Sequence, residues 1–227
     1  MKKKILAMCL VVALAATAIA GATLAFFTDT DKADNTFTTG TVKIQLVEEQ
    51  RNGEGREEFV QDQKIYPYTG VAGDKDQAKN YVDKIVNVKR LGSEAAYVRV
   101  LVAVPAELKN VLHIDWNSDA WTQATAPQVT INGTLHDVYV MTYNTALLKK
   151  NEFTKDQAMF GFYLDSAVDY NNKDGGYTLN GELINYDLSR LTIPVFAQGI
   201  QAQGFESAEA AFTAAKLTTD PWFVPQA

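Results

Sequence analysis

The stretch YVDKIVNVKRLGSEAAYVRVLVAV, residues 81–104, predicts the fold more strongly than any other part of the chain. Two runs rich in β-branched residues, 81–89 and 96–104, flank the short polar sequence RLGSE, and such runs are typical of β-strands. We therefore predict two strands that pair with each other. The second run is apolar on both faces apart from Arg99, which is typical of a central strand in a two-layer structure.

The N-terminal side of this stretch predicts one strand followed by a loop. Residues 41–47 (TVKIQLV) alternate in polarity, with Val42, Ile44 and Leu46 on one face, as in a half-buried strand. Residues 48–58 (EEQRNGEGREE) are mostly charged and contain two glycines. Since they cannot bury their side chains, we predict that they form an exposed loop.

The C-terminal side predicts a hairpin, two further strands and one helix. Asn132-Gly133 within residues 128–143 is the strongest short signal for a hairpin. Strands are predicted at residues 159–164 and 191–196, with Pro194 at an edge or a bulge. The helix is predicted from a cap, an acidic first turn and apolar residues at helical spacing, namely Ser207, Glu209, and Phe205, Ala208, Phe212 and Ala215. Many short strands and one helix predict an all-β fold, a jelly-roll-like β-sandwich with long loops and one short C-terminal helix.

Residues 1–27 predict export of the protein. Lysines at positions 2–4 precede an uncharged apolar run and then a series of small residues, which is the pattern of a signal peptide. Thr23, Ala25 and Phe26 form the predicted cleavage signal, with a cut before Phe26 preferred to a cut before Thr23. A retained signal anchor is the alternative, because the apolar run is long enough to span a bilayer. We predict a signal peptide at residues 1–25 and a secreted protein of the extracellular matrix or cell surface.

Charge and cysteine content restrict what the remaining chain can be. The whole chain carries a net charge of −6, and loss of the three signal-peptide lysines leaves −9, so a nucleic-acid partner is not expected. Cys9, the single cysteine, lies in the predicted signal peptide, so stability must come from a packed core rather than from disulfides. We divide the remainder into an N-terminal arm with the first strand, residues 26–46, and a β-sandwich domain, residues 47–227.

Polar clusters with catalytic or metal-binding character are weak in this chain. His113 and His136 are 23 residues apart and neither lies in an HExxH motif; a zinc site with Asp115 and Asp137 would require two strands to meet. Residues 165–177 are rich in oxygen ligands, but no frame fits a calcium-binding loop, so a solvated turn explains them better. We therefore predict no catalytic, cofactor-binding or metal-binding residue and no cofactor.

Three regions of the sequence resemble known exported proteins. Small residues, A-F-F-T-D at residues 25–29, a polar spacer and N-T-F-T-T-G-T-V-K-I at residues 35–44 resemble secreted Gram-positive proteins of the TasA and camelysin (CalY) family. Residues 84–100 and 195–212 are similar to segments of other exported proteins that depend on the SipW type of signal peptidase. The resemblance implies a jelly-roll-like sandwich and, for the TasA branch, a biofilm-matrix protein whose fibres form when the N-terminal strand of one subunit completes the sheet of the next.

The same resemblance implies a second function, since camelysin-like members are classed as cell-surface metalloendopeptidases. A monomeric surface module for binding or adhesion is a third possibility. The expected partners of the fibre-forming protein are further copies of itself, the SipW type of signal peptidase and other matrix proteins.

The N-terminal arm itself favours assembly. Phenylalanines on a polar arm cannot cover a core from their own position in the sequence, whereas an arm that adds a strand elsewhere gains main-chain hydrogen bonds and buries its rings. We predict that the assembly strand contains six apolar residues, namely Phe26, Phe27, Phe37, Val42, Ile44 and Leu46. The alternative is that the arm folds back on its own domain.

Overall fold

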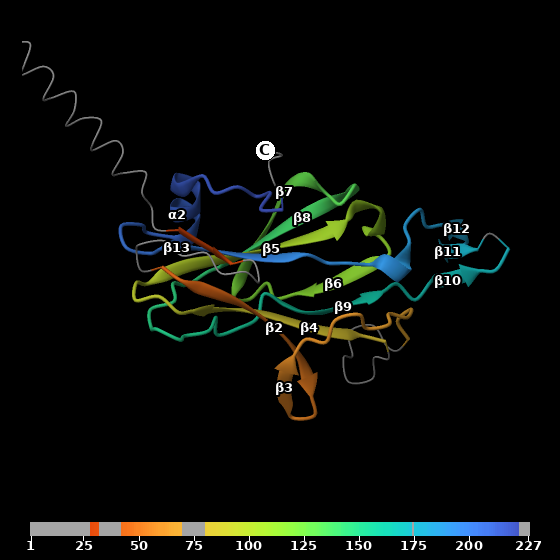
Figure 1. Ribbon diagram of the computed structural model, residues 1–227, viewed down its shortest axis with the longest axis horizontal. Helices are drawn as coiled ribbons and strands as arrows, with labels where there is room; N and C mark the ends of the chain where they lie inside the picture. The colour runs from red at the N-terminus through yellow and green to blue at the C-terminus, as the bar shows by residue number, and fades with distance from the viewer. Residues whose placement is uncertain (1–27, 32–41, 70–79, 174, 223–227) are drawn as a thin grey trace, which may run out of the picture.

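The computed structural model describes residues 28–31, 42–69, 80–173 and 175–222. Two five-stranded antiparallel sheets are stacked as a sandwich (Figure 1). The first sheet contains, in spatial order, β1 (Thr28–Asp31), β13 (Val195–Gln201), β5 (Ala96–Pro105), β8 (Thr134–Tyr143) and β7 (Trp121–Ile131). The second contains β3 (Gly55–Glu58), β2 (Ile44–Asn52), β4 (Val82–Arg90), β9 (Met159–Leu164) and β6 (Leu112–Trp116). The predicted all-β sandwich is therefore confirmed.

Smaller elements lie at the two ends of the sandwich. A three-stranded sheet at one end consists of β10 (Val168–Asn171), β11 (Gly176–Leu179) and β12 (Glu182–Leu183). The helix α2 (Ala208–Ala215) packs at the other end, beside β13. Two short 3-10 turns are η1 (Ala106–Leu108) and η2 (Leu188–Arg190). No helix in these described segments is long and apolar enough to cross a bilayer.

The chain winds repeatedly from one sheet to the other. It crosses between the sheets from β4 to β5, from β5 to β6, from β6 to β7 and from β8 to β9. The last strand, β13, is inserted between β1 and β5. This winding agrees with the predicted jelly-roll-like arrangement, and it makes the first and the last strand of the chain neighbours.

The pairing predicted for residues 81–104 is wrong, although both strands exist. β4 pairs with β2 and β9 in the second sheet, whereas β5 pairs with β13 and β8 in the first. The connection is held away from a hairpin turn because Leu91 and Gly92 both donate their backbone N–H to the carbonyl of Lys43. The two strands face each other across the core instead of sharing an edge.

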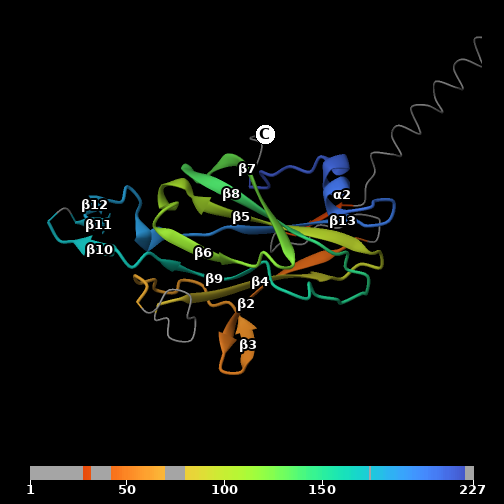
Figure 2. The same ribbon diagram turned by 180° about the vertical axis from the view of Figure 1, so that it is seen from behind.

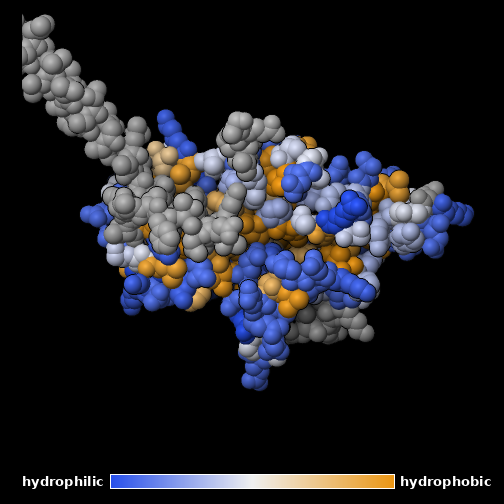
Figure 3. All heavy atoms as spheres, in the orientation of Figure 1, coloured by the Kyte–Doolittle hydropathy of each residue, from blue (hydrophilic) through white to orange (hydrophobic). Residues whose placement is uncertain are grey.

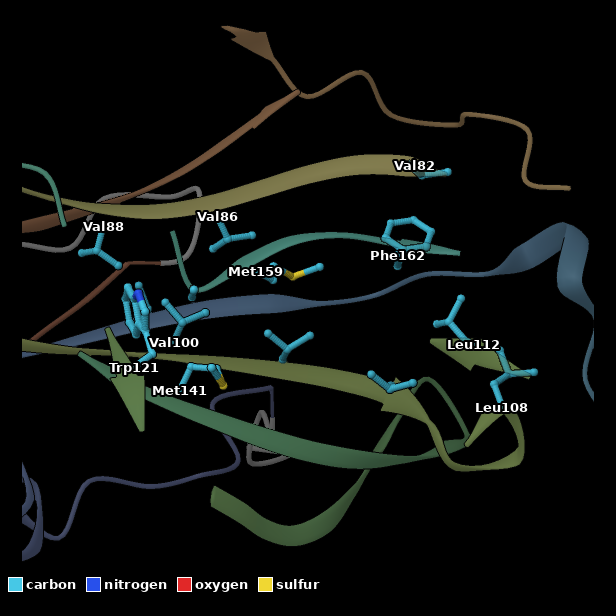
Figure 4. Close-up of a cluster of buried hydrophobic side chains, with 14 of the residues drawn as sticks. Val82, Val86, Val88, Val100, Leu108, Leu112, Trp121, Met141, Met159 and Phe162 are labelled. Atoms are coloured by element: carbon cyan, nitrogen blue, oxygen red, sulfur yellow. The ribbon is translucent and has the colours of Figure 1, made fainter. Parts of the chain in front are cut away.

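The main core fills the space between the sheets (Figure 4). Val86 of β4 and Met159 of β9 point from one side toward Val100 of β5 and Met141 of β8 on the other, and all four are fully buried. Complete burial of a side chain of this size stabilises the fold by about 1.5–3 kcal/mol. Trp121 closes this core at one end, where its indole N–H donates to the carbonyl of Asp156 at 2.9 Å.

The predicted loop at residues 48–58 is instead a hairpin. β2 continues to Asn52, and β3 returns after a turn in which Gly53 has a φ of 60°, a conformation that glycine adopts without strain. Side-chain contacts hold the exposed strands together, including Asn52 to Glu57 at 2.6 Å and Glu49 to Arg56 at 3.6 Å. The side chains are exposed as predicted, but their cross-strand pairing still supports a ladder.

The other local predictions are largely confirmed. Asn132 and Gly133, with φ values of 50° and 82°, form the turn between β7 and β8. The strand predicted at residues 159–164 is β9. Ser207 caps α2 by accepting a hydrogen bond from the N–H of Ala210 at 3.1 Å. The strand predicted at residues 191–196 begins only at Val195, and Pro194 directly precedes it, where its carbonyl accepts a hydrogen bond from the N–H of Ala103 in β5.

Candidate functional site

Among the described residues, the edge of the first sheet at β13 is paired along only part of its length. Four residue pairs join β1 to β13, from Thr28 opposite Ile200 to Asp31 opposite Ala197. On its other side β13 pairs with β5 along its whole length, from Val195 to Gln201. Within the described residues, Val195 and Phe196 therefore have no strand neighbour on the β1 side. This is the kind of edge to which another strand can be added.

A groove of about 690 Å³ lies beside this uncovered part of the edge. One wall is the segment that leads into β13, and the other is formed by β4, β9 and the chain after β3. Figure 3 shows apolar surface along the seam between the two layers, above the β2–β3 hairpin. The apolar side chains that line the groove are Phe59, Ile65, Val82, Phe162, Leu164, Leu188, Leu191, Ile193 and Val195. Such a lining fits a partner that brings apolar side chains.

A buried ion pair interrupts this apolar lining. The Lys84 ammonium is 2.7 Å from a carboxylate oxygen of Glu48, and the Lys84 side chain is 6% exposed against 25% for Glu48. The ammonium also lies 4.1 Å from the centre of the Phe59 ring, in a cation–π contact. Lys84 takes this position because it is two residues from both Val82 and Val86 along β4 and therefore shares their inward face.

The other outer strands of the two large sheets are poorly suited to strand addition. In β7, Pro127 cannot donate a backbone hydrogen bond, and the register with β8 shifts between Ala126 and Val129. β6 has a register shift between Asp115 and Trp116. Figure 2 shows β6 and β7 from behind. β3 has four residues, all exposed and three of them charged. These features are the usual protections of a sheet edge, and within the described residues Val195 and Phe196 of β13 carry none of them.

The predicted assembly residues fall into two groups. Val42 and Ile44, each 2% exposed, lie in the core of their own chain, and the half-buried Leu46 packs against that core. Ile44 fills the space above Gly199 of β13, where an added Cβ would lie 2.9 Å from its Cγ2 atom. The remaining three, Phe26, Phe27 and Phe37, and the predicted cleavage residues Thr23 and Ala25 lie outside the described residues.

The two histidines do not meet. His113 on β6 lies on the outer face of the second sheet, where its Nε2 atom is 2.9 Å from Asp165. His136 on β8 is 3% exposed, and its Nδ1 atom lies 2.8 Å from the carbonyl oxygen of Thr134. His136 is on the outer face of the first sheet, because it alternates with Asp137 and shares the face of Val138. The zinc site considered from sequence is therefore not assembled, and no cluster of three potential metal ligands occurs among the described residues.

An aromatic cluster surrounds His113 on the second sheet. Tyr163 stacks against His113 and Tyr68 at centroid distances of 5.1 and 4.7 Å. The backbone N–H of Ala167 and then the His113 side chain lower the pKa of Asp165. Burial, followed by the charge of Asp115, raises the pKa of Tyr81, whose hydroxyl lies 3.1 Å from that carboxylate. Because each of these rings packs against Tyr163, we assign the cluster a structural role in covering the outer face of the second sheet.

Sequence reasoning missed the groove and Lys84. A signal for Lys84 was present, since a lysine on the apolar face of YVDKIVNVK must bury its charge or find a partner. The groove wall at residues 191–194 left no comparable signal, because this segment lies between η2 and β13, outside any strand. Its position depends on distant contacts, such as the N–H of Ala103 donating to the carbonyl of Pro194.

Comparison with known proteins agrees with the N-terminal motif. The family model described as camelysin metallo-endopeptidase matches residues 1–51, which include A-F-F-T-D and most of β2. Comparison with curated proteins and with solved structures gave no significant match. The match over residues 1–51 supports the resemblance to the TasA and camelysin family that the sequence suggested.

Proposed function

We propose that this protein is a secreted structural protein of the extracellular matrix whose subunits assemble by donating the N-terminal arm to the next subunit. The observation that carries the proposal is the short β1–β13 pairing at the edge of an apolar groove. An arm from a second subunit can replace β1 with no net loss of main-chain hydrogen bonds. The groove then supplies additional apolar contact that the short cis pairing does not supply.

The arm has the length and the composition for this exchange. Sixteen residues, 26–41, lie between the predicted cleavage point and Val42, and an extended chain of this length reaches roughly 50 Å. The arm carries three phenylalanines, and burial of each ring contributes about 1.5–3 kcal/mol before the entropic cost of ordering the arm is subtracted. Exposure of the arm by signal cleavage would restrict assembly to the exported protein.

We place the end of the exchanged segment before Val42. Val42 and Ile44 are buried in their own subunit, and six residue pairs, from Ile44 to Glu49, join β2 to β4. Donation of these residues to another subunit would expose the core of the donor. A longer donor segment that includes Val42, Ile44 and Leu46 is the alternative, and it predicts a different response to mutation of Ile44.

The test compares a protein that starts at Phe26 with one that starts at Val42. Sedimentation and electron microscopy measure polymer, and circular dichroism measures the fold. We expect polymer from the first protein and a folded monomer from the second. Polymer from both proteins would refute arm donation. A folded monomer from both would favour a monomeric surface module.

The description of the matched family as a metallo-endopeptidase keeps a second function open. A catalytic zinc needs three placed protein ligands and a general base. The separation of His113 from His136 argues against a site built on these residues. We therefore propose a structural rather than an enzymatic role. An assay of casein cleavage by the pure protein tests the peptidase alternative.

A further inference from the structure

The groove is mainly apolar but contains one buried ion pair, between Lys84 and Glu48. Lys84 is 5% exposed, and its ammonium is held by Glu48 at 2.7 Å and by the Phe59 ring. Glu48 is the more accessible partner, with a quarter of its side chain exposed. The carboxylate of Glu48 can therefore turn to solvent, whereas the buried ammonium then needs another anion.

The arm of a second subunit carries such anions. Asp29, Asp31 and Asp34 lie among the first nine residues after the predicted cleavage point. In the register of β1, Asp29 and Asp31 are opposite Gly199 and Ala197. Gly199 and Ala197 are on the core-facing side of β13, since one lies against Ile44 and the other belongs to the main core. Residues directly opposite in an antiparallel pair share a face, so positions 29 and 31 of an arm bound in this register lie on the core-facing side of the ladder.

We propose that Lys84 selects the incoming arm by binding one of its carboxylates. Glu48 pairs with Lys84 before the arm binds, and the carboxylate of the arm displaces it. This inference rests on the arm-donation function proposed above. It assigns a second copy of this chain, with an acidic and aromatic arm, as the occupant of the groove. The carboxylates of the arm support that choice, because one of them can pair with the Lys84 ammonium once Glu48 turns to solvent.

Displacement of Glu48 by the arm predicts opposite effects of mutating Glu48 and Lys84 on assembly. If the pair only stabilises the fold, loss of either partner weakens the protein in the same direction. If Glu48 competes with the arm, Glu48→Gln removes a competitor and strengthens assembly, whereas Lys84→Met removes the binding group and weakens it. A charge-assisted hydrogen bond of this kind corresponds to a change of about tenfold or more in the critical concentration.

The experiment measures the critical concentration for assembly of the protein that starts at Phe26, together with its thermal midpoint. The variants are Lys84→Met, Glu48→Gln and, as a control, Lys150→Met, since Lys150 is exposed and does not line the groove. We expect the critical concentration to rise at least about tenfold for Lys84→Met, to fall for Glu48→Gln and to stay unchanged for Lys150→Met.

A donor-side variant keeps the proposal testable if Lys84→Met fails to fold. Replacing Asp29, Asp31 and Asp34 by asparagine removes the carboxylates of the arm. It should raise the critical concentration about as much as Lys84→Met, with no further loss when the two changes are combined. Normal assembly of this arm variant, or weaker assembly of Glu48→Gln together with a lower midpoint, would overturn the proposal. If the unmodified protein does not assemble, or assembles without its arm, the proposed function itself fails.

Discussion

Replacement of Ile44 by lysine tests where the exchanged arm ends. Ile44 is 2% exposed and its side chain occupies the space above Gly199, so a lysine there has no room to extend within the core. The change removes the burial of one isoleucine, about 1.5–3 kcal/mol, and adds a comparable cost for a charged group that is poorly solvated. We expect a total loss of about 3–6 kcal/mol, a large fraction of the 5–15 kcal/mol typical of a whole domain.

The assay is thermal unfolding followed by circular dichroism. For a domain of this size the expected loss lowers the midpoint by roughly 6–24 °C. Gln45→Lys is the matched control, because Gln45 is the next residue of β2 and is exposed on the opposite face. It should change the stability by less than about 0.5 kcal/mol. A folded Ile44→Lys protein with a normal midpoint but no polymer would refute this reasoning, because residue 44 would then be donated to the next subunit.

Three further predictions concern processing, chemistry and pH. N-terminal sequencing of the extracellular protein should begin at Phe26; a start at Met1 in the membrane fraction would indicate a signal anchor. Pure protein should not cleave casein, and cleavage that is lost with a chelator and with His113→Ala or His136→Ala would establish a peptidase. The folded-state pKa of Asp165 is lowered, so its contribution to stability is present above the unfolded pKa and is lost as pH falls through the folded value. Asp165→Asn should therefore lower the thermal midpoint at pH 7 and have no effect in acid well below the lowered folded-state pKa; an equal loss at both pH values would contradict the assignment.

The sequence predicted strands better than it predicted their partners. The β-branched runs that form β4 and β5 are visible in the sequence because local periodicity determines which face is buried. Their assignment to different sheets depends on other strands: β4 pairs with β2 and β9, and β5 pairs with β13 and β8. The sequence near β4 and β5 does not specify these partners. Local polarity also misled the prediction at residues 48–58, where exposed charged residues pair across a hairpin.

In the candidate site, too, the sequence predicted which side chains are buried but not how distant segments come together. The buried faces of Val42 and Ile44 follow from alternation in TVKIQLV and are confirmed. The groove depends on the extended segment at residues 191–194, which approaches β4 and β9 only in the folded chain. No periodic pattern in that segment specifies its position, so its role could not be predicted from the sequence.

The central claim is that the arm of one subunit pairs with β13 of another, and cysteine cross-linking tests it most directly. Asp31 and Ala197 are opposite residues in the β1–β13 ladder, and opposite Cα atoms in such a ladder lie about 4.5–5.5 Å apart, within the range of a disulfide. The chain has no cysteine after Cys9, so proteins that start at Phe26 can carry Asp31→Cys or Ala197→Cys as their single thiol.

The measurement is a non-reducing gel of the two single-cysteine proteins after they are mixed, assembled and oxidised. Each protein oxidised alone is the control for random contacts between identical thiols. Arm donation predicts a covalent dimer that forms in the mixture, is absent from both controls and disappears on reduction. Polymer that sediments from the mixture without this cross-link would contradict the account, because the arms would then remain paired within their own subunits.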